Sequence, residues 1–175
     1  MRRIRLVATL LALTGCLWLG RAAAQDRGKA DTDRDFVMKA SAAGLAEVNL
    51  GSMAAKQATN ADVKKFGQNV VADHNKVNRE LLRIADRKRF TPARAMDDTH
   101  RQLANRLAQL RGADFDRQFM GQIVKDHKEA IALFENEAKN GNDKDLKEFA
   151  SKTLPALREH LKMAESLDSK FRTNR

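Results

Sequence analysis

The chain has 175 residues, a length that suits one domain, and a formal net charge of +10 at pH 7. Lysine and arginine alternate with acidic residues along most of it, tyrosine is absent, and other aromatic residues are few. This pattern is typical of solvated helix faces and argues against nucleic-acid binding, because it provides neither a concentrated basic stripe nor platforms for base stacking.

The first residues have the pattern of a secretory leader. Three arginines among the first five residues precede an apolar run over residues 6–19, and alanines at positions 22–24 precede the polar Gln25. The run is shorter than the ~20 residues that a membrane-spanning helix needs. We therefore expect a signal peptide over residues 1–24, cleaved after Ala24, and a periplasmic or secreted mature chain with no transmembrane segment. Removing the four arginines of the leader leaves a net charge of +6.

Lipid attachment is an alternative to this cleavage. Residues 13–16 resemble a bacterial lipobox, in which the cysteine, here Cys16, becomes lipid-modified and anchors the protein. The apolar run continues past Cys16, however, which favours cleavage after Ala24. With that cleavage the mature chain contains no cysteine, and disulfides and thiol chemistry are excluded.

The rest of the chain has the periodicity of amphipathic helices. After a polar linker over residues 25–34, apolar residues recur three or four positions apart, which predicts one helical domain over residues 35–170. Asn60 and Asp114 are suitable N-caps for two of the helices. The expected long helices cover residues 35–59, 61–88, 114–140 and 143–169, and a short one covers residues 97–110.

Short, long and short connections between four long helices match one architecture, a ferritin-like four-helix bundle. Its long crossover would contain the short extra helix. A weak internal repeat supports two similar helical pairs, because Phe66 precedes His74 by the same interval at which Phe119 precedes His127. The predicted fold class is therefore all-α.

The apolar stripe of each predicted long helix contains one polar residue of a type that can bind metals. These residues are Glu47, His74, His127 and His160. Glu47 and His74 are almost equally far from the turn at Asn60, so they should lie at one level of facing helices. We expect the four side chains to converge in the bundle core.

Imidazole and carboxylate groups on facing helices can bind Zn, Cu, Mn or Fe. The Glu-x-x-His motif of di-iron bundles is absent, which argues against a ferritin-type ferroxidase. The alternative is a structural cluster, in which Glu47 accepts hydrogen bonds from imidazoles and fixes the register of the bundle.

His100 also lies on an apolar stripe, where we expect it to cap the bundle. Asp73, Asp126 and Glu159 each precede a histidine, and we expect them to be solvated or bonded to a neighbouring helix, or else to orient an imidazole.

Several motifs together resemble a known family. They are Gly44 to Val48, Val71 to His74, Gly112 to Asp116, Val124 to His127 and Leu154 to Leu161. Over about Asp35 to Leu167 the chain resembles the exported bacterial domain of unknown function 4142. The resemblance implies a ferritin-like bundle in the cell envelope, and the family's motif positions coincide with the four polar residues. It implies no established activity.

Two functions remain open from the sequence. The first is an exported bundle without catalysis that binds a metal through Glu47, His74, His127 and His160, since an enzyme would need an open coordination position that the sequence does not reveal. The second is a metal-free structural or stress-protective protein whose basic surface contacts anionic components of the cell envelope. The sequence leaves the oligomeric state open.

Overall fold

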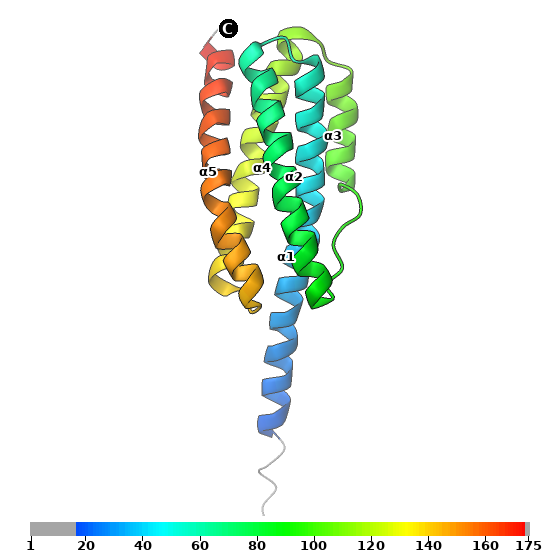
Figure 1. Cartoon of the computed structure of the whole chain (residues 1–175), viewed down its shortest axis with the longest axis vertical. Coiled ribbons are helices and arrows are strands. Elements are labelled where there is room, and N and C mark those ends of the chain that lie inside the picture. The colour runs from blue at the N-terminus through cyan, green and yellow to red at the C-terminus, as the bar shows by residue number, and fades with distance from the viewer. Residues whose placement is uncertain (1–16, 174–175) are drawn as a thin grey trace, which may run out of the picture.

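The computed structural model describes residues 17–173, with side chains over residues 32–172, and within that range every regular element is a helix. Figure 1 shows the helices running along one common axis. They are α1 (Leu17–Gln57), α2 (Ala61–Lys88), α3 (Asp98–Ala108), α4 (Gly112–Asn140) and α5 (Lys144–Thr173).

The predicted bundle with a long crossover is confirmed. Helix α1 packs mainly on α2, and α4 packs mainly on α5, so the bundle consists of two antiparallel hairpins (Figure 1). The hairpins join through contacts of α1 with α4 and of α2 with α5. Helix α3 lies in the crossover between α2 and α4, where it contacts α1 and α4.

The N-terminal part of the chain differs from the expectation. The segment predicted as a linker, residues 25–34, is helical and continuous with α1. The segment contains no proline, and its Asp33 is buried in the bundle, so nothing interrupts the helix there. Residues 1–16, with Cys16, lie outside the described residues, and cleavage after Ala24 remains a prediction. None of the helices within residues 17–173 combines the length and the hydropathy needed to cross a membrane.

One of the two predicted N-caps is confirmed. The side chain of Asn60 accepts hydrogen bonds from the backbone at the start of α2, and Asp97 does the same for α3. The prediction of Asp114 as the N-cap of α4 is wrong. The helix begins two residues earlier at Gly112, whose φ of 61° lies in the left-handed region that glycine tolerates. Asp114 lies instead in the first turn, where it pairs with Arg117.

Each hairpin turn is held by a buried aspartate from the other hairpin. Asp116 of α4 accepts hydrogen bonds from the backbone nitrogens of Thr59 (3.1 Å) and Asn60 (2.8 Å), in the turn between α1 and α2. At the opposite end, Asp33 of α1 accepts from the backbone nitrogens of residues 142 (2.8 Å) and 143 (2.9 Å), in the turn between α4 and α5. These reciprocal bonds fix the axial position of one hairpin against the other.

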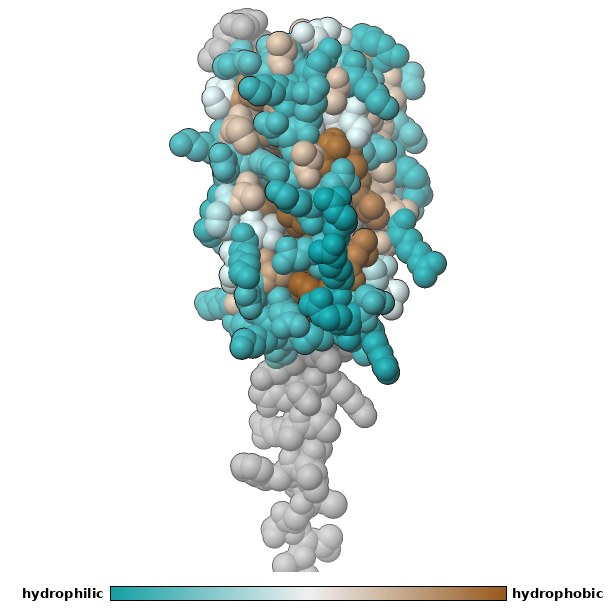
Figure 2. Space-filling view, viewed as in Figure 1, coloured by the Kyte–Doolittle hydropathy of each residue, from teal (hydrophilic) through white to brown (hydrophobic). Residues whose placement is uncertain are grey.

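The apolar core consists of two clusters separated along the bundle axis. One includes Leu50, Phe66, Phe119 and Leu167, and the other includes Val37, Leu81, Phe134 and Phe149. On each long helix one polar residue of the predicted site lies between its contributions to the two clusters. On the outside, hydrophilic residues cover most of the face formed by α2 and α5, with apolar residues only in small patches (Figure 2).

The contact between α1 and α2 depends on two glycines that face each other. A Cβ added at Gly67 would lie 2.7 Å from the carbonyl oxygen of Gly51, and one added at Gly51 would lie 3.0 Å from the carbonyl oxygen of Gly67. The absence of both side chains therefore lets the two backbones approach closely. This crossing lies between Asn60 and the level of the polar residues, so it contributes to their register.

Substitution of Gly67 by alanine tests this contact. We expect Gly67→Ala to reduce the free energy of unfolding by about 1–3 kcal/mol, because the new methyl group must displace a rigid backbone carbonyl. Gly121 in α4 is a matched control, since its added Cβ would meet only Asp168 Oδ1 at an ordinary 3.7 Å. Gly121→Ala should raise the free energy of unfolding by about 0.5–1 kcal/mol through helix propensity. Urea unfolding measures both, and equal effects of the two substitutions would contradict a close crossing.

Candidate metal centre

The structure brings together the four polar residues that the sequence places on the apolar stripes. Glu47 lies on α1, His74 on α2, His127 on α4 and His160 on α5. All four are buried, with residue exposures of 5%, 7%, 1% and 4%. They form a polar layer between the two apolar clusters of the core.

The three imidazoles have the compact arrangement of a metal-binding group. One ligand atom from each of His74, His127 and His160 can be chosen so that all three lie within 4.8 Å of one another. The ring centroids are 5.5–5.7 Å apart. His127 Nε2 lies 3.4 Å from His160 Nδ1, which is about the separation of two nitrogens that bind one tetrahedral Zn²⁺ ion at roughly 2.0–2.1 Å.

Hydrogen bonds on the outer side of the rings determine which nitrogens carry protons. His127 Nδ1 lies 3.1 Å from the carbonyl oxygen of Ile123, to which it donates, so that its Nε2 keeps the lone pair. His160 Nε2 lies 3.1 Å from Asp73 Oδ2 and donates to this carboxylate, which leaves the lone pair of a neutral ring on Nδ1. The inward nitrogens of the two rings therefore lie 3.4 Å apart, close enough to share one proton or to bind one ion.

His74 adds a third nitrogen to this arrangement. Its Nε2 is buried and has no hydrogen-bond partner among the described residues. A buried polar atom without a partner costs free energy, and two facing lone pairs repel each other. A positive charge between the rings would relieve both costs. A single proton shared by His127 and His160 would satisfy two nitrogens, whereas a metal ion would satisfy all three.

Burial keeps two of these imidazoles neutral at physiological pH. It lowers the pKa of His74 from 6.5 to about 3, and the nearby rings of His127 and His160 act in the same direction. It also lowers the pKa of His127 to about 4, with a further contribution from His160. Neutral imidazole is the form that binds metals, so these two rings need not lose a proton before binding.

Glu47 lies beside the imidazole group and not within it. Its Oε1 is 3.4 Å from Nδ1 of His127, the nitrogen that points away from the other rings, and its Oε2 is buried without a hydrogen-bond partner. Burial raises the pKa of Glu47 from 4.5 to about 8, and the Asp126 carboxylate adds to this rise. Its position suits a group that orients His127 and can balance the charge of a bound cation.

His100 belongs to a separate group at the edge of the bundle. Its Nδ1 lies 2.8 Å from Asp97 Oδ2, and its Nε2 lies 3.6 Å from Asp126 Oδ1. These carboxylates, Asp126 above all, raise the pKa of His100 from 6.5 to about 9. The sequence pattern did not indicate a carboxylate pair around His100, because Asp97 and Asp126 meet only when α3 folds against α4. The sequence pattern also missed the buried Glu137, whose pKa is raised to about 7 by burial and by the nearby carboxylate of Asp33.

The fold and this layer define a class of protein, an α-helical bundle with an imidazole cluster buried between its long helices. Residues 19–167 match the family described as Domain of unknown function (DUF4142), and the chain belongs to this family. The resemblance that the sequence motifs indicate is confirmed. A comparison with curated protein sequences gives no match.

Two solved structures share the fold at low sequence identity. One is the crystal structure of a DUF305 fragment from Deinococcus radiodurans, with a TM-score of 0.70, 13% identity, and coverage of 79% of this chain and 96% of that one. The other is CopM in the Cu(II)-bound form, with a TM-score of 0.67, 20% identity, and coverage of 79% of this chain and 97% of that one. Both likenesses concern the fold alone.

The charge states in the polar layer predict the titration of individual histidines. In metal-free protein, ¹⁵N-detected NMR should show His74 and His127 neutral throughout pH 5–8, whereas His100 should lose its proton only near pH 9. Because its folded-state pKa is raised, His100 contributes stability that is present below pH 6.5 and is lost as the pH rises through about 9. Asp126→Asn should lower the pKa of His100. Titration of His127 near pH 6.5 would contradict the buried, neutral state.

Proposed function

We propose that this chain is an exported helical-bundle protein that binds one divalent transition-metal ion through His74, His127 and His160. The observation that carries the proposal is the convergence of three buried imidazoles, two with nitrogens 3.4 Å apart and one with a nitrogen that has no hydrogen-bond partner among the described residues. A metal ion would give a nitrogen of each of the three imidazoles a bonding partner. A purely structural polar cluster leaves His74 Nε2 without a bond.

The donor set favours copper or zinc among the metals considered. Imidazole nitrogen suits Cu and Zn, whereas Mn prefers oxygen ligands, and Cu²⁺ ranks highest in affinity at a given nitrogen site. The solved structure of CopM holds Cu(II) on a similar fold, although the low identity gives no correspondence of ligands. Fe is less suited than Cu or Zn, because the site offers no Glu-x-x-His pairs for a carboxylate-bridged centre.

Glu47 has a supporting role in this proposal. Its contact is with the outer nitrogen of His127, so we assign it to orient that ring and to balance the charge of the ion, while coordination by its free oxygen would need a rotation of the side chain. Asp73 orients His160 in the same way. Three imidazole ligands leave a fourth position for water or another ligand.

Metal-dependent stabilisation tests the site. At pH 7.5, Cu²⁺ or Zn²⁺ at about 100 times its Kd should stabilise the chelator-treated protein by about 2.7 kcal/mol and raise its Tm by roughly 5–10 °C. His74→Ala should abolish the shift. Glu47→Gln should retain it with an affinity weakened roughly 10- to 100-fold.

His100→Gln is the matched control for metal binding, since it removes a histidine that lies outside the imidazole group. Its metal-induced shift should equal that of the wild type. If the wild-type Tm is the same with and without every metal tested, the proposal is wrong and the polar layer is architecture.

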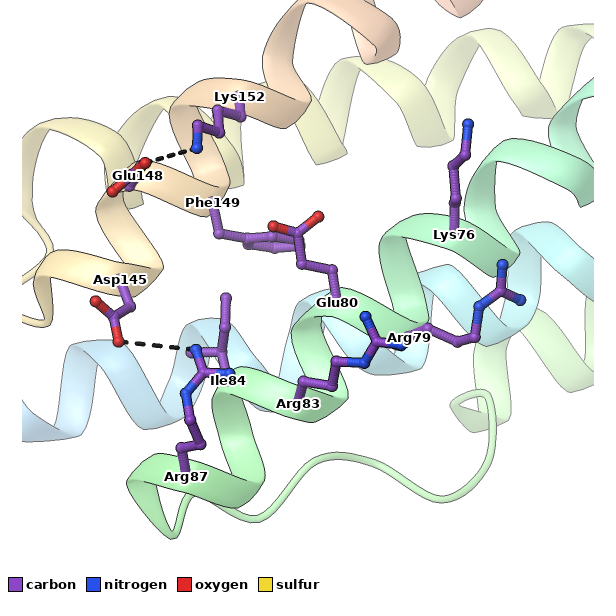
Figure 3. A pocket seen from close by; sticks show the side chains of 10 residues that line it. All are labelled: Lys76, Arg79, Glu80, Arg83, Ile84, Arg87, Asp145, Glu148, Phe149 and Lys152. Atoms are coloured by element: carbon purple, nitrogen blue, oxygen red, sulfur yellow. Dashed lines mark ion pairs between the residues drawn. The ribbon is translucent and has the colours of Figure 1, made fainter.

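A second candidate function is contact with anionic components of the cell envelope. A groove of about 560 Å³ lies between α2 and α5, and basic side chains of α2 line it (Figure 3). Arg87 pairs with Asp145 at 3.9 Å, whereas Arg79 and Arg83 have no ion-pair partner among the described residues. These two guanidinium groups can therefore bind phosphate or carboxylate groups of an anionic surface.

Vesicle binding distinguishes this function from the metal proposal. We expect binding to phosphatidylglycerol vesicles at low ionic strength that declines at 0.3 M salt through screening. Replacement of both Arg79 and Arg83 by glutamine should weaken it roughly 30-fold, because each basic residue near such a surface contributes about 1 kcal/mol. The metal-induced Tm shift should not change in that variant. Vesicle binding that does not depend on salt or on these arginines would contradict the candidate.

A further inference from the structure

A cavity beside the polar layer is the second feature of the core that calls for a ligand. It has a volume of about 540 Å³ and lies among α1, α2 and α4, with residues of the crossover and α3 along one side. This volume is within the range of small-molecule sites, roughly 300–1,000 Å³. Its lining is mostly apolar and includes Ala43, Val77, Leu81, Leu133 and Phe134.

The polar part of the lining is acidic and unsatisfied. Glu47 and Asp126 both line the cavity, with side-chain exposures of 7% and 9%. Glu47 Oε2 and Asp126 Oδ2 are buried and have no hydrogen-bond partner among the described residues. His74, with its partnerless Nε2, lines the same cavity. A ligand that supplies N–H donors would satisfy the two carboxylate oxygens.

The charges around the cavity favour a cation. Its lining includes the carboxylates of Asp97, Asp126 and Glu129 and only two basic groups, Lys39 and His100, while burial raises the pKa of Glu47 to about 8 and leaves it an uncharged acceptor near neutral pH. Both basic groups already have carboxylate partners, since Lys39 Nζ lies 2.7 Å from Asp35 and His100 lies between Asp97 and Asp126.

We propose that this cavity binds a small organic cation, an ammonium group on an apolar body. The ammonium would donate to Asp126, which supplies the negative charge, and to Glu47 as a second acceptor. The hydrocarbon part would contact the alanine, leucine and phenylalanine side chains of the wall. A bare metal ion would leave the space between these side chains unfilled. This site requires no metal in the imidazole group, so the inference is independent of the metal proposal.

Calorimetric titration of the chelator-treated protein at pH 7.5 tests the inference, with 2-phenylethylamine as the probe. We expect saturable binding at one site. The isosteric alcohol 2-phenylethanol should bind at least about 10-fold more weakly, because it lacks the charge that strengthens hydrogen bonds to a carboxylate. Equal affinities, or no saturable binding of the amine, would overturn the proposal.

Variants locate the binding site within the cavity. Asp126→Asn should weaken binding of the amine about 10-fold, whereas Glu135→Gln, which removes the same charge from an exposed side chain of the same helix that does not line the cavity, should change it less than about two-fold. Ala43→Leu should fill part of the cavity and reduce the affinity for both probes. Circular dichroism melts establish that each variant is folded. An Asp126→Asn protein that is folded and binds the amine as tightly as the wild type would overturn the assignment.

Discussion

The interaction on which the rest of this structure depends is the set of hydrogen bonds that fixes the tautomers of two buried histidines. The Ile123 carbonyl holds the proton of His127 on Nδ1, and Asp73 holds a proton of His160 on Nε2. The remaining nitrogens must then face inward with their lone pairs, toward His74. Buried nitrogens without a hydrogen-bond partner cost free energy, so a positive charge between the rings would stabilise the polar layer.

The two ends of the bundle keep this layer in register. Asp33 and Asp116 each bond the turn of the opposite hairpin, and the close approach of Gly51 and Gly67 sets the distance between α1 and α2. Because these contacts fix the axial positions of the four long helices, their polar residues meet at one level. The apolar clusters above and below then exclude water from the layer, which accounts for the lowered pKa of His74.

The crossover supplies part of the wall of the cavity, which a four-helix bundle without this segment would lack. It covers the side of the bundle between α1 and α4, where the cavity lies, and it brings His100 against Asp126. Gln122 donates to Oδ1 of that carboxylate and His100 lies 3.6 Å from the same oxygen, which leaves Oδ2 without a partner beside the cavity. The metal group and the proposed ammonium site therefore share a border at Glu47 and His74, while each has its own charged partner.

The sequence by itself determined the helices and the residues that enter the core, because helical periodicity places Glu47, His74, His127 and His160 on apolar stripes and the turn residues end the helices nearby. The tertiary structure alone decided what these residues do there. Tautomers depend on partners such as Asp73, which is distant from His160 in sequence, and a cavity depends on how neighbouring helices pack. The position of Glu47 outside the imidazole group, the continuity of α1 through residues 25–34 and the start of α4 before Asp114 also required contacts between distant segments or backbone geometry, which local patterns do not encode.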